Sequence, residues 1–213
     1  MPSVVACADA IGFDCSTKLT VASAKAAAKM GFKFAMRYTG LSQPNPEDID
    51  PNEVQIVLGE IGALWVIQHC LNPGWSPSGS LGQAHGTAAG RNALAGGYAQ
   101  GDHLWQDLEG VAIGTPAQSV IDYCDAWGDA VERAGYLHGL YVGFGSALSA
   151  EQLFALRTPH AYFAASPTYF LPTRGYAITQ IVEDVEPRAL GFKIDVDMAG
   201  ADALGGRPLW MAA

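Results

Sequence analysis

The stretch LWQDLE, residues 104–109, has the pattern of a strand in a sheet whose outer face is covered by helices. Side chains of a strand alternate between two faces, so Trp105, Asp107 and Glu109 share one face while the two leucines point outward. Two carboxylates that point into the same cavity repel each other, and this repulsion destabilises the folded protein. Such a pair therefore indicates a function. Active sites of α/β barrels lie at the carboxyl ends of the strands. The stretch therefore predicts a barrel strand whose end carries a functional site.

Short apolar runs of this kind alternate with Ala-rich or amphipathic stretches along the whole chain, which is typical of a parallel sheet with crossover helices. The predicted strands are Ile11–Asp14, Phe32–Tyr38, Leu64–His69, Leu104–Glu109, Gly139–Phe144, Ala161–Ala165, Tyr176–Val182 and Phe192–Asp197. The predicted helices are Thr20–Met30, Pro51–Gly59, Gly82–Leu94, Pro116–Ala134 and Ala150–Leu156. The pattern predicts an α/β fold, a single-domain (β/α)8 TIM-like barrel.

The last two crossovers differ from the others. Ser166–Arg174 contains Pro167 and Pro172, and Glu183–Gly191 is short and contains Pro187. Proline removes a backbone donor and breaks a helix interior. We therefore expect irregular loops there, and a barrel with some outer helices reduced or missing in its second half.

The composition favours one folded domain. The chain has 213 residues, of which 49% are hydrophobic and 15% charged, so a large core can form. We expect residues 1–10 to be an N-terminal extension and residues 11–213 to form the barrel domain. The net charge of −9 argues against a nucleic-acid partner, because phosphate binding needs a basic surface.

The sequence shows no targeting or membrane segment. No run reaches the roughly 18 uninterrupted apolar residues of a membrane helix. Residues 1–10 carry no basic residue ahead of an apolar stretch, so we expect no signal peptide and no membrane span. This predicts synthesis in the cytoplasm, and a cell-wall substrate would then require release by a phage-type or other non-classical route.

Cysteine and histidine patterns give little support to a metal site. The four cysteines, Cys7, Cys15, Cys70 and Cys124, lie far apart without a C-x-x-C pair. We interpret them as buried or idle thiols, with a disulfide as the alternative. The histidines show neither H-x-H nor H-E-x-x-H spacing. We therefore expect no metal ligands and no cofactor.

Acids recur at the ends of the first and last predicted strands. Asp14 ends Ile11–Asp14, and Asp195 and Asp197 end the eighth run. The first and eighth strands of a closed barrel are neighbours, so these acids can meet Asp107 and Glu109 at one mouth. An alternative is that each acid only caps the loop or helix that follows it. Another is that the acids hold a hard cation such as Mg²⁺ or Ca²⁺.

Several of these segments together resemble one family. Gly12–Asp14, Trp105–Glu109, Gly139–Tyr141, Ala177–Gln180 and Ile194–Asp197 are similar to successive motifs of the glycoside-hydrolase-like barrel domain of bacteria and phages. That domain is similar in turn to the family 25 lysozymes. The resemblance extends from about Ile11 to Trp210 and implies a TIM-like barrel that acts on a glycan.

The resemblance implies roles for the acids. In the family 25 lysozymes the Glu of a D-x-E pair is the general acid and the Asp assists, which implies Glu109 as acid and Asp107 as assisting carboxylate. We place Asp14 in the same catalytic set. Glycoside hydrolysis needs one protonated and one ionised carboxyl group, and crowded acids push their pKa values apart.

The remaining expected site residues would bind substrate. They are Asp195, Asp197, Trp105, Tyr141, Phe163 and Gln180. Aromatic rings among them could stack on sugar faces. Two positions depart from the lysozyme pattern, since Thr179 replaces an aromatic residue and Phe163 replaces a tryptophan.

Three functions follow from these patterns. The leading one is a lysozyme-like hydrolase of the β-linked amino sugars of the bacterial cell wall, whose partner is peptidoglycan or a related glycan. The first alternative is a catalytically silent module that binds cell wall or carbohydrate, or serves as a phage structural part. The second is a metal-dependent hydrolase.

Overall fold

A computed structural model describes residues 3–165 and 174–213, and within them eight strands close into a barrel. These strands are β2 (Ile11–Cys15), β3 (Ala35–Thr39), β4 (Ala63–Gln68), β5 (His103–Leu108), β6 (Leu137–Val142), β7 (Ala161–Ala164), β8 (Ile178–Val185) and β9 (Ile194–Ala199). Each is paired with the next, and β9 closes on β2. Every predicted strand overlaps one of them, which confirms the predicted TIM-like barrel.

The last barrel strand runs in the direction opposite to the one predicted. Strands β2 to β8 are parallel, whereas β9 is antiparallel to both β8 and β2. A parallel connection needs about a dozen or more residues, and only residues 186–193 join β8 to β9. Asp195 therefore lies at the start of its strand and Asp197 in its middle, and neither residue ends it. Because the strand is reversed, Asp195 still lies beside Asp14.

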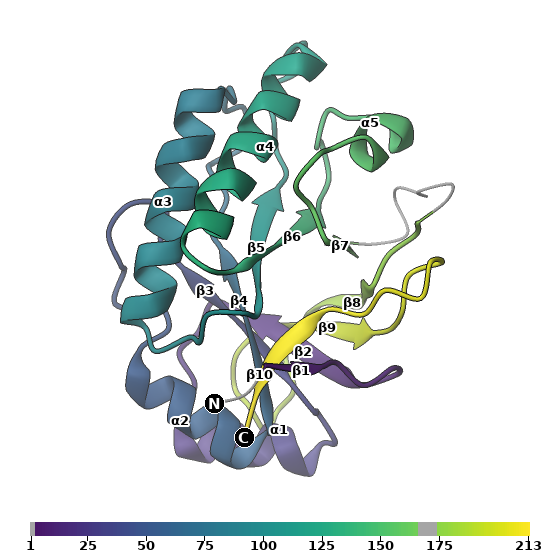
Figure 1. The fold of residues 1–213 in the computed structure, drawn as a ribbon. Coiled ribbons are helices and arrows are strands. Elements are labelled where there is room, and N and C mark those ends of the chain that lie inside the picture. The colour runs from purple at the N-terminus through teal and green to yellow at the C-terminus, as the bar shows by residue number, and fades with distance from the viewer. Residues whose placement is uncertain (1–2, 166–173) are drawn as a thin grey trace.

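Helices cover the outside of the barrel unevenly. They are α1 (Val21–Lys29), α2 (Pro51–Glu60), α3 (Gly79–Ala95), α4 (Ala117–Arg133) and the single short turn α5 (Ala150–Phe154). Figure 1 shows α3 and α4 side by side along one flank. Residues 183–191 contain no helix, as predicted, whereas most of Ser166–Arg174 lies outside the described residues. Among the described helices, none is long and apolar enough to cross a membrane.

The amino end of the barrel is closed by two strands that the sequence analysis did not predict. Strand β1 (Ser3–Val5) pairs with β10 (Leu209–Ala212), and β10 pairs with the start of β4 (Figure 1). Trp210 of β10 packs against Phe34 and Trp65 in the barrel interior. This aromatic cluster fills the lower barrel, so the carboxyl ends of the parallel strands form the open end.

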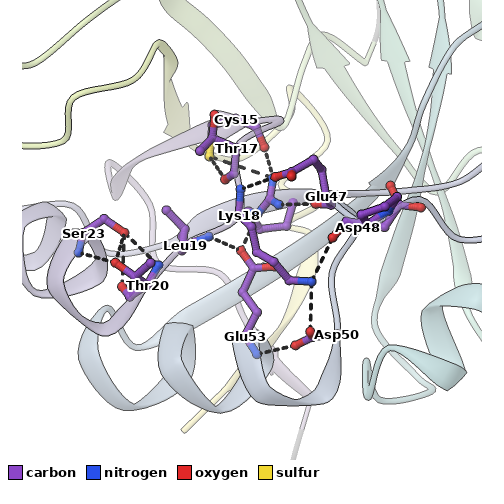
Figure 2. Close-up of polar contacts among 12 residues, drawn as sticks. Cys15, Thr17, Lys18, Leu19, Thr20, Ser23, Glu47, Asp48, Asp50 and Glu53 are labelled. Atoms are coloured by element: carbon purple, nitrogen blue, oxygen red, sulfur yellow. Dashed lines mark hydrogen bonds and ion pairs between the residues drawn. The ribbon is translucent and has the colours of Figure 1, made fainter.

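A buried polar network fixes the loop that follows β2. The Arg37 guanidinium forms an ion pair with Glu53 at 2.6 Å, and both side chains are almost fully buried. Arg37 also donates to the Cys15 carbonyl, and the Leu19 amide donates to Glu53 at 2.7 Å. Figure 2 shows the bond from Leu19 to Glu53 together with the Lys18–Asp50 ion pair. The carboxyl end of β2, which carries Asp14, is thereby held in a defined position.

Candidate active site

The predicted acids meet at the open end of the barrel. A cavity of about 330 Å³ is lined by Asp107, Glu109 and Asp195, with Tyr38 and Tyr141 among the other residues of its wall. A second cavity of about 230 Å³ contains Asp14 and shares Tyr38 and Asp195 with the first. The expected convergence of acids on one mouth is therefore present. Asp14 opens to the adjoining cavity and Asp197 lies below both.

Asp107 and Glu109 occupy different depths on the same side of the site. Asp107 lies within β5 and is 7% exposed, while Glu109 directly follows the strand and is half-buried. The Cys70 thiol donates to Glu109 Oε1 at 3.3 Å. Burial, and then the negative charge of Glu109, raise the pKa of Asp107 well above its ordinary value. The deeper acid of the pair is therefore the harder one to ionise.

A second acidic cluster lies where β2 meets β9. Asp14 and Asp195 face each other in the strand register, and the Tyr38 hydroxyl donates to Asp14 Oδ1 at 2.8 Å. Burial, and then the charge of Asp195, raise the pKa of Asp14 to about 7. The Asp184 amide donates to Asp195 at 2.6 Å. Asp14 can therefore hold a proton close to neutral pH.

Asp197 lies one layer deeper and is fully buried. Neither of its carboxylate oxygens has a hydrogen-bond partner at normal distance within residues 3–165 and 174–213. Burial, and then the charge of Asp14, raise its pKa well above the ordinary value. Asp197 therefore lies beneath the site, close to Asp14, and is too deep to touch a ligand.

Two uncharged polar residues, Tyr141 and Gln180, also line the cavity of about 330 Å³, and Tyr141 is paired with Asp107 in the register of β5 and β6. The Tyr141 hydroxyl donates to Gln180 Oε1 at 3.1 Å, and both residues line the cavity. They come from β6 and β8. Their hydroxyl and amide groups can donate to, or accept from, a neutral polar ligand such as a sugar. Tyr141 and Gln180, both expected to bind substrate, thus lie at the surface of the acidic cavity.

Two expected stacking residues are placed differently from the prediction. Trp105 and Phe163 are fully buried, with their ring centroids 5.9 Å apart in an edge-to-face arrangement. Trp105 also packs edge-on against Trp65. Alternation correctly puts Trp105 on the inner face, but two residues below Asp107 that face is a packed layer. These rings support the floor of the site and offer no face to a ligand.

Sequence analysis missed the residues beside Glu109 that form an apolar cavity of about 610 Å³. Cys70, Val111, Ile113 and Phe144 line it together with Glu109. The Phe144 side chain is 85% exposed, and it also lines the acidic cavity. The signal was Gly143-Phe144-Gly145, an aromatic residue between two glycines directly after β6. An apolar wall next to polar, ionisable groups is a common form of a small-molecule site.

A family model describes most of this chain. The Rv2525c-like, glycoside hydrolase-like domain matches residues 13–199. No curated protein matches the chain in sequence.

Solved structures share the fold at low sequence identity. The Tat-secreted protein Rv2525c of Mycobacterium tuberculosis matches with a TM-score of 0.67 and 14% identity over 93% of this chain and 98% of that chain. The modular autolysin LytC of Streptococcus pneumoniae matches with a TM-score of 0.63 and 12% identity over 94% of this chain and 46% of that chain. The catalytic domain of endolysin ply40 from the Listeria monocytogenes bacteriophage P40 gives 0.59 and 15%, over 91% and 94%.

Proposed function

Because this chain belongs to the Rv2525c-like family of glycoside hydrolase-like domains, we propose that it hydrolyses a β-linked amino-sugar glycan of the bacterial cell wall. The names of its structural neighbours support the substrate class, since they include an autolysin and an endolysin. The autolysin has also been crystallised with a synthetic peptidoglycan ligand. The mycobacterial neighbour is Tat-secreted, which supports a place of action outside the cytoplasm.

The Asp107–Glu109 pair is the single observation that carries the proposal. Two carboxyl groups two residues apart share one wall, one of them buried and one facing the cavity. Strongly interacting acids titrate as a pair and hold one proton between them over a range of pH. Such a pair contains both the donor and the anion that glycoside hydrolysis requires.

Glu109 is the member that can reach a glycosidic oxygen, because it borders both the acidic and the apolar cavities. We assign it the role of general acid, which protonates the leaving oxygen as the bond to the anomeric carbon breaks. The adjacent Asp107 supplies the proton held in the pair and assists at the sugar. Asp195 lines the same cavity, where a carboxylate can stabilise the positive charge that develops on the sugar ring.

The walls on either side of Glu109 fit the two faces of a sugar. Phe144 offers an exposed ring to the apolar C–H face, while Tyr141 and Gln180 offer polar atoms to hydroxyl and N-acetyl groups. The cavities of about 330 and 610 Å³ together provide room for sugars on both sides of the bond that is cut.

The substitution Glu109→Gln tests this assignment. It preserves shape but removes the transferable proton, so release of reducing ends from purified peptidoglycan should fall by about 10²–10⁴-fold. Glu183→Gln is the matched control, because Glu183 lines the same cavity away from the pair. Its rate should stay within a few-fold of the wild-type rate.

Two outcomes would contradict the proposal. Equal losses in both variants would mean that cavity charge matters and not a proton donor. If wild-type protein releases no reducing sugar from peptidoglycan or chitin oligomers between about pH 4 and pH 8, hydrolysis is excluded. Retained binding to cell walls in that case would identify a carbohydrate-binding module.

A further inference from the structure

One ionisable group in the site has no part in the proposed hydrolysis. Cys70 follows β4, the strand next to β5, so its side chain meets the acids that end β5. The Cys70 sulfur lies 3.3 Å from Glu109 Oε1. One ligand atom from each of Cys70, Asp107 and Glu109 lies within 4.8 Å of the other two. Three potential metal ligands are therefore gathered at one point.

The surroundings of Asp107 suit a cation, because the groups that act on it in the described parts of the chain include no positive charge. Asp107 is more than nine-tenths buried, and its Oδ1 has no hydrogen-bond partner in the described parts of the chain. The nearest charged groups to affect it are the carboxylates of Glu109 and Asp14. A buried carboxylate oxygen is normally satisfied by a donor or a cation. Here the available neighbours are acids and a weak thiol donor.

We propose that Cys70, Asp107 and Glu109 form a binding site for a zinc-like divalent cation. Zinc accepts cysteine sulfur together with carboxylate oxygens and is usually four-coordinate. Magnesium and calcium prefer sets made of oxygen alone, so the thiolate selects against them. Glu109 faces the cavity, which leaves the fourth position open to water. On binding, the thiol proton passes to solvent and the sulfur donates its electron pair to the ion.

The site regulates the proposed function, and this part of the inference rests on that function. The ion would occupy both carboxylates that the hydrolysis uses, so a bound ion and a productive substrate exclude each other. Zinc should therefore inhibit glycan hydrolysis, and a chelator should restore it. This role differs from a metal-dependent hydrolase, in which a chelator would abolish activity.

Cobalt(II) absorption tests the site without reference to activity. Co²⁺ bound to a thiolate gives a charge-transfer band in the near ultraviolet, and a tetrahedral site gives intense visible bands. Titration of the reduced full-length protein should show one saturable site. Cys70→Ser should lose the charge-transfer band, whereas Cys7→Ser, which removes the exposed thiol, should keep it. Asp107→Asn and Glu109→Gln should each weaken binding by about tenfold or more.

The outcomes separate this inference from the proposed function. If reduced wild-type protein gives no thiolate–cobalt band, or if Cys70→Ser keeps the band, the metal site is wrong. If the band behaves as expected but no glycan is cut, the site stands and the hydrolase proposal fails. Thermal unfolding of Cys70→Ser in the absence of metal should match that of the wild type, which shows that the lost band is not lost folding.

Discussion

At the scale of single residues, the site is distinguished by acids whose burial raises their pKa values. Asp197 shows this most clearly, since it is fully buried and neither oxygen has a partner at normal distance in the described residues. Its carboxyl group lies below Asp14; burial, and then the charge of Asp14, raise the pKa of Asp197 well above its ordinary value. Such a group lowers stability at neutral pH, because folding must either bury a charge or take up a proton. Buried acids of this kind therefore lower the free energy of unfolding as the pH rises.

Asp197→Asn should stabilise the protein at alkaline pH. The folded-state pKa is raised, so wild-type stability falls as pH rises above the unfolded-state value of about 4. Asparagine cannot ionise and avoids this loss. Urea unfolding at about pH 8 should show a higher midpoint for Asp197→Asn than for wild type, with little difference near pH 4.

The exposed Asp9 provides the control for this measurement. Asp9→Asn changes the net charge by the same amount at a loop position, and asparagine tolerates its positive φ of 60°. Its unfolding midpoint should follow that of wild type at both pH values. A gain as large as that of Asp197→Asn would show that net charge, and not burial, sets the effect.

At the scale of elements, the contact of α3 with α4 depends on glycine. A Cβ atom built on Gly82 would lie 2.2 Å from the Tyr123 carbonyl oxygen, and one on Gly86 would lie 2.4 Å from that of Trp127. The missing side chains let the two helix backbones approach closely. Both helices also contact β5, the strand that carries Asp107 and is followed by Glu109.

Gly86→Ala should therefore destabilise the protein, although alanine favours helices. The added methyl group has no room, and overpacking typically costs about 1–3 kcal/mol. Gly59→Ala is the matched control, because Gly59 lies in α2 and a Cβ there has no atom within 4 Å. That change should stabilise by roughly 0.4–1 kcal/mol. Chemical unfolding curves would reveal the opposite signs, and a shared sign would contradict this account of the α3–α4 contact.

At the scale of the whole molecule, two sets of buried groups oppose each other in their pH dependence. Burial raises the pKa values of four aspartates: Asp14, Asp102, Asp107 and Asp197. These groups favour folding at acidic pH and cost stability as pH rises. Burial lowers the pKa values of three histidines: His85, His103 and His138. These groups cost stability as pH falls below about 6.5, since the unfolded chain then takes up protons that the folded chain does not.

The two trends predict a stability maximum at mildly acidic pH, between about 4 and 7. Above pH 7 the histidines no longer contribute, and stability should fall by about 1.4 kcal/mol per pH unit for each proton that the native state still holds. Unfolding midpoints measured across this range would test the balance. A maximum above about pH 8 would mean that the buried aspartates are ionised in the folded protein.

Local patterns in the sequence were sufficient to locate the barrel and most of its acids. Strand alternation places Asp107 and Glu109 on the inner face whatever their neighbours are, because side chains alternate within the strand itself. The apolar runs predicted the strands, and the glycine and proline residues that flank them predicted where the strands end. For this reason the eight strand positions and the convergence of acids followed from the chain alone.

Only the tertiary structure decided the direction of β9 and the depth at which each inward-facing side chain lies. Strand β9 is reversed because the link that follows β8 is too short for a parallel connection. This reversal puts Asp195 at the mouth of the barrel and Asp197 beneath it. Whether an inward residue touches solvent depends on strand stagger around the barrel, which buries Trp105. Cys70 lies close to Asp107 and Glu109 because β4, which precedes Cys70, is paired with β5. Sequence specifies which face a side chain takes, but only the closed barrel specifies its layer and its neighbours.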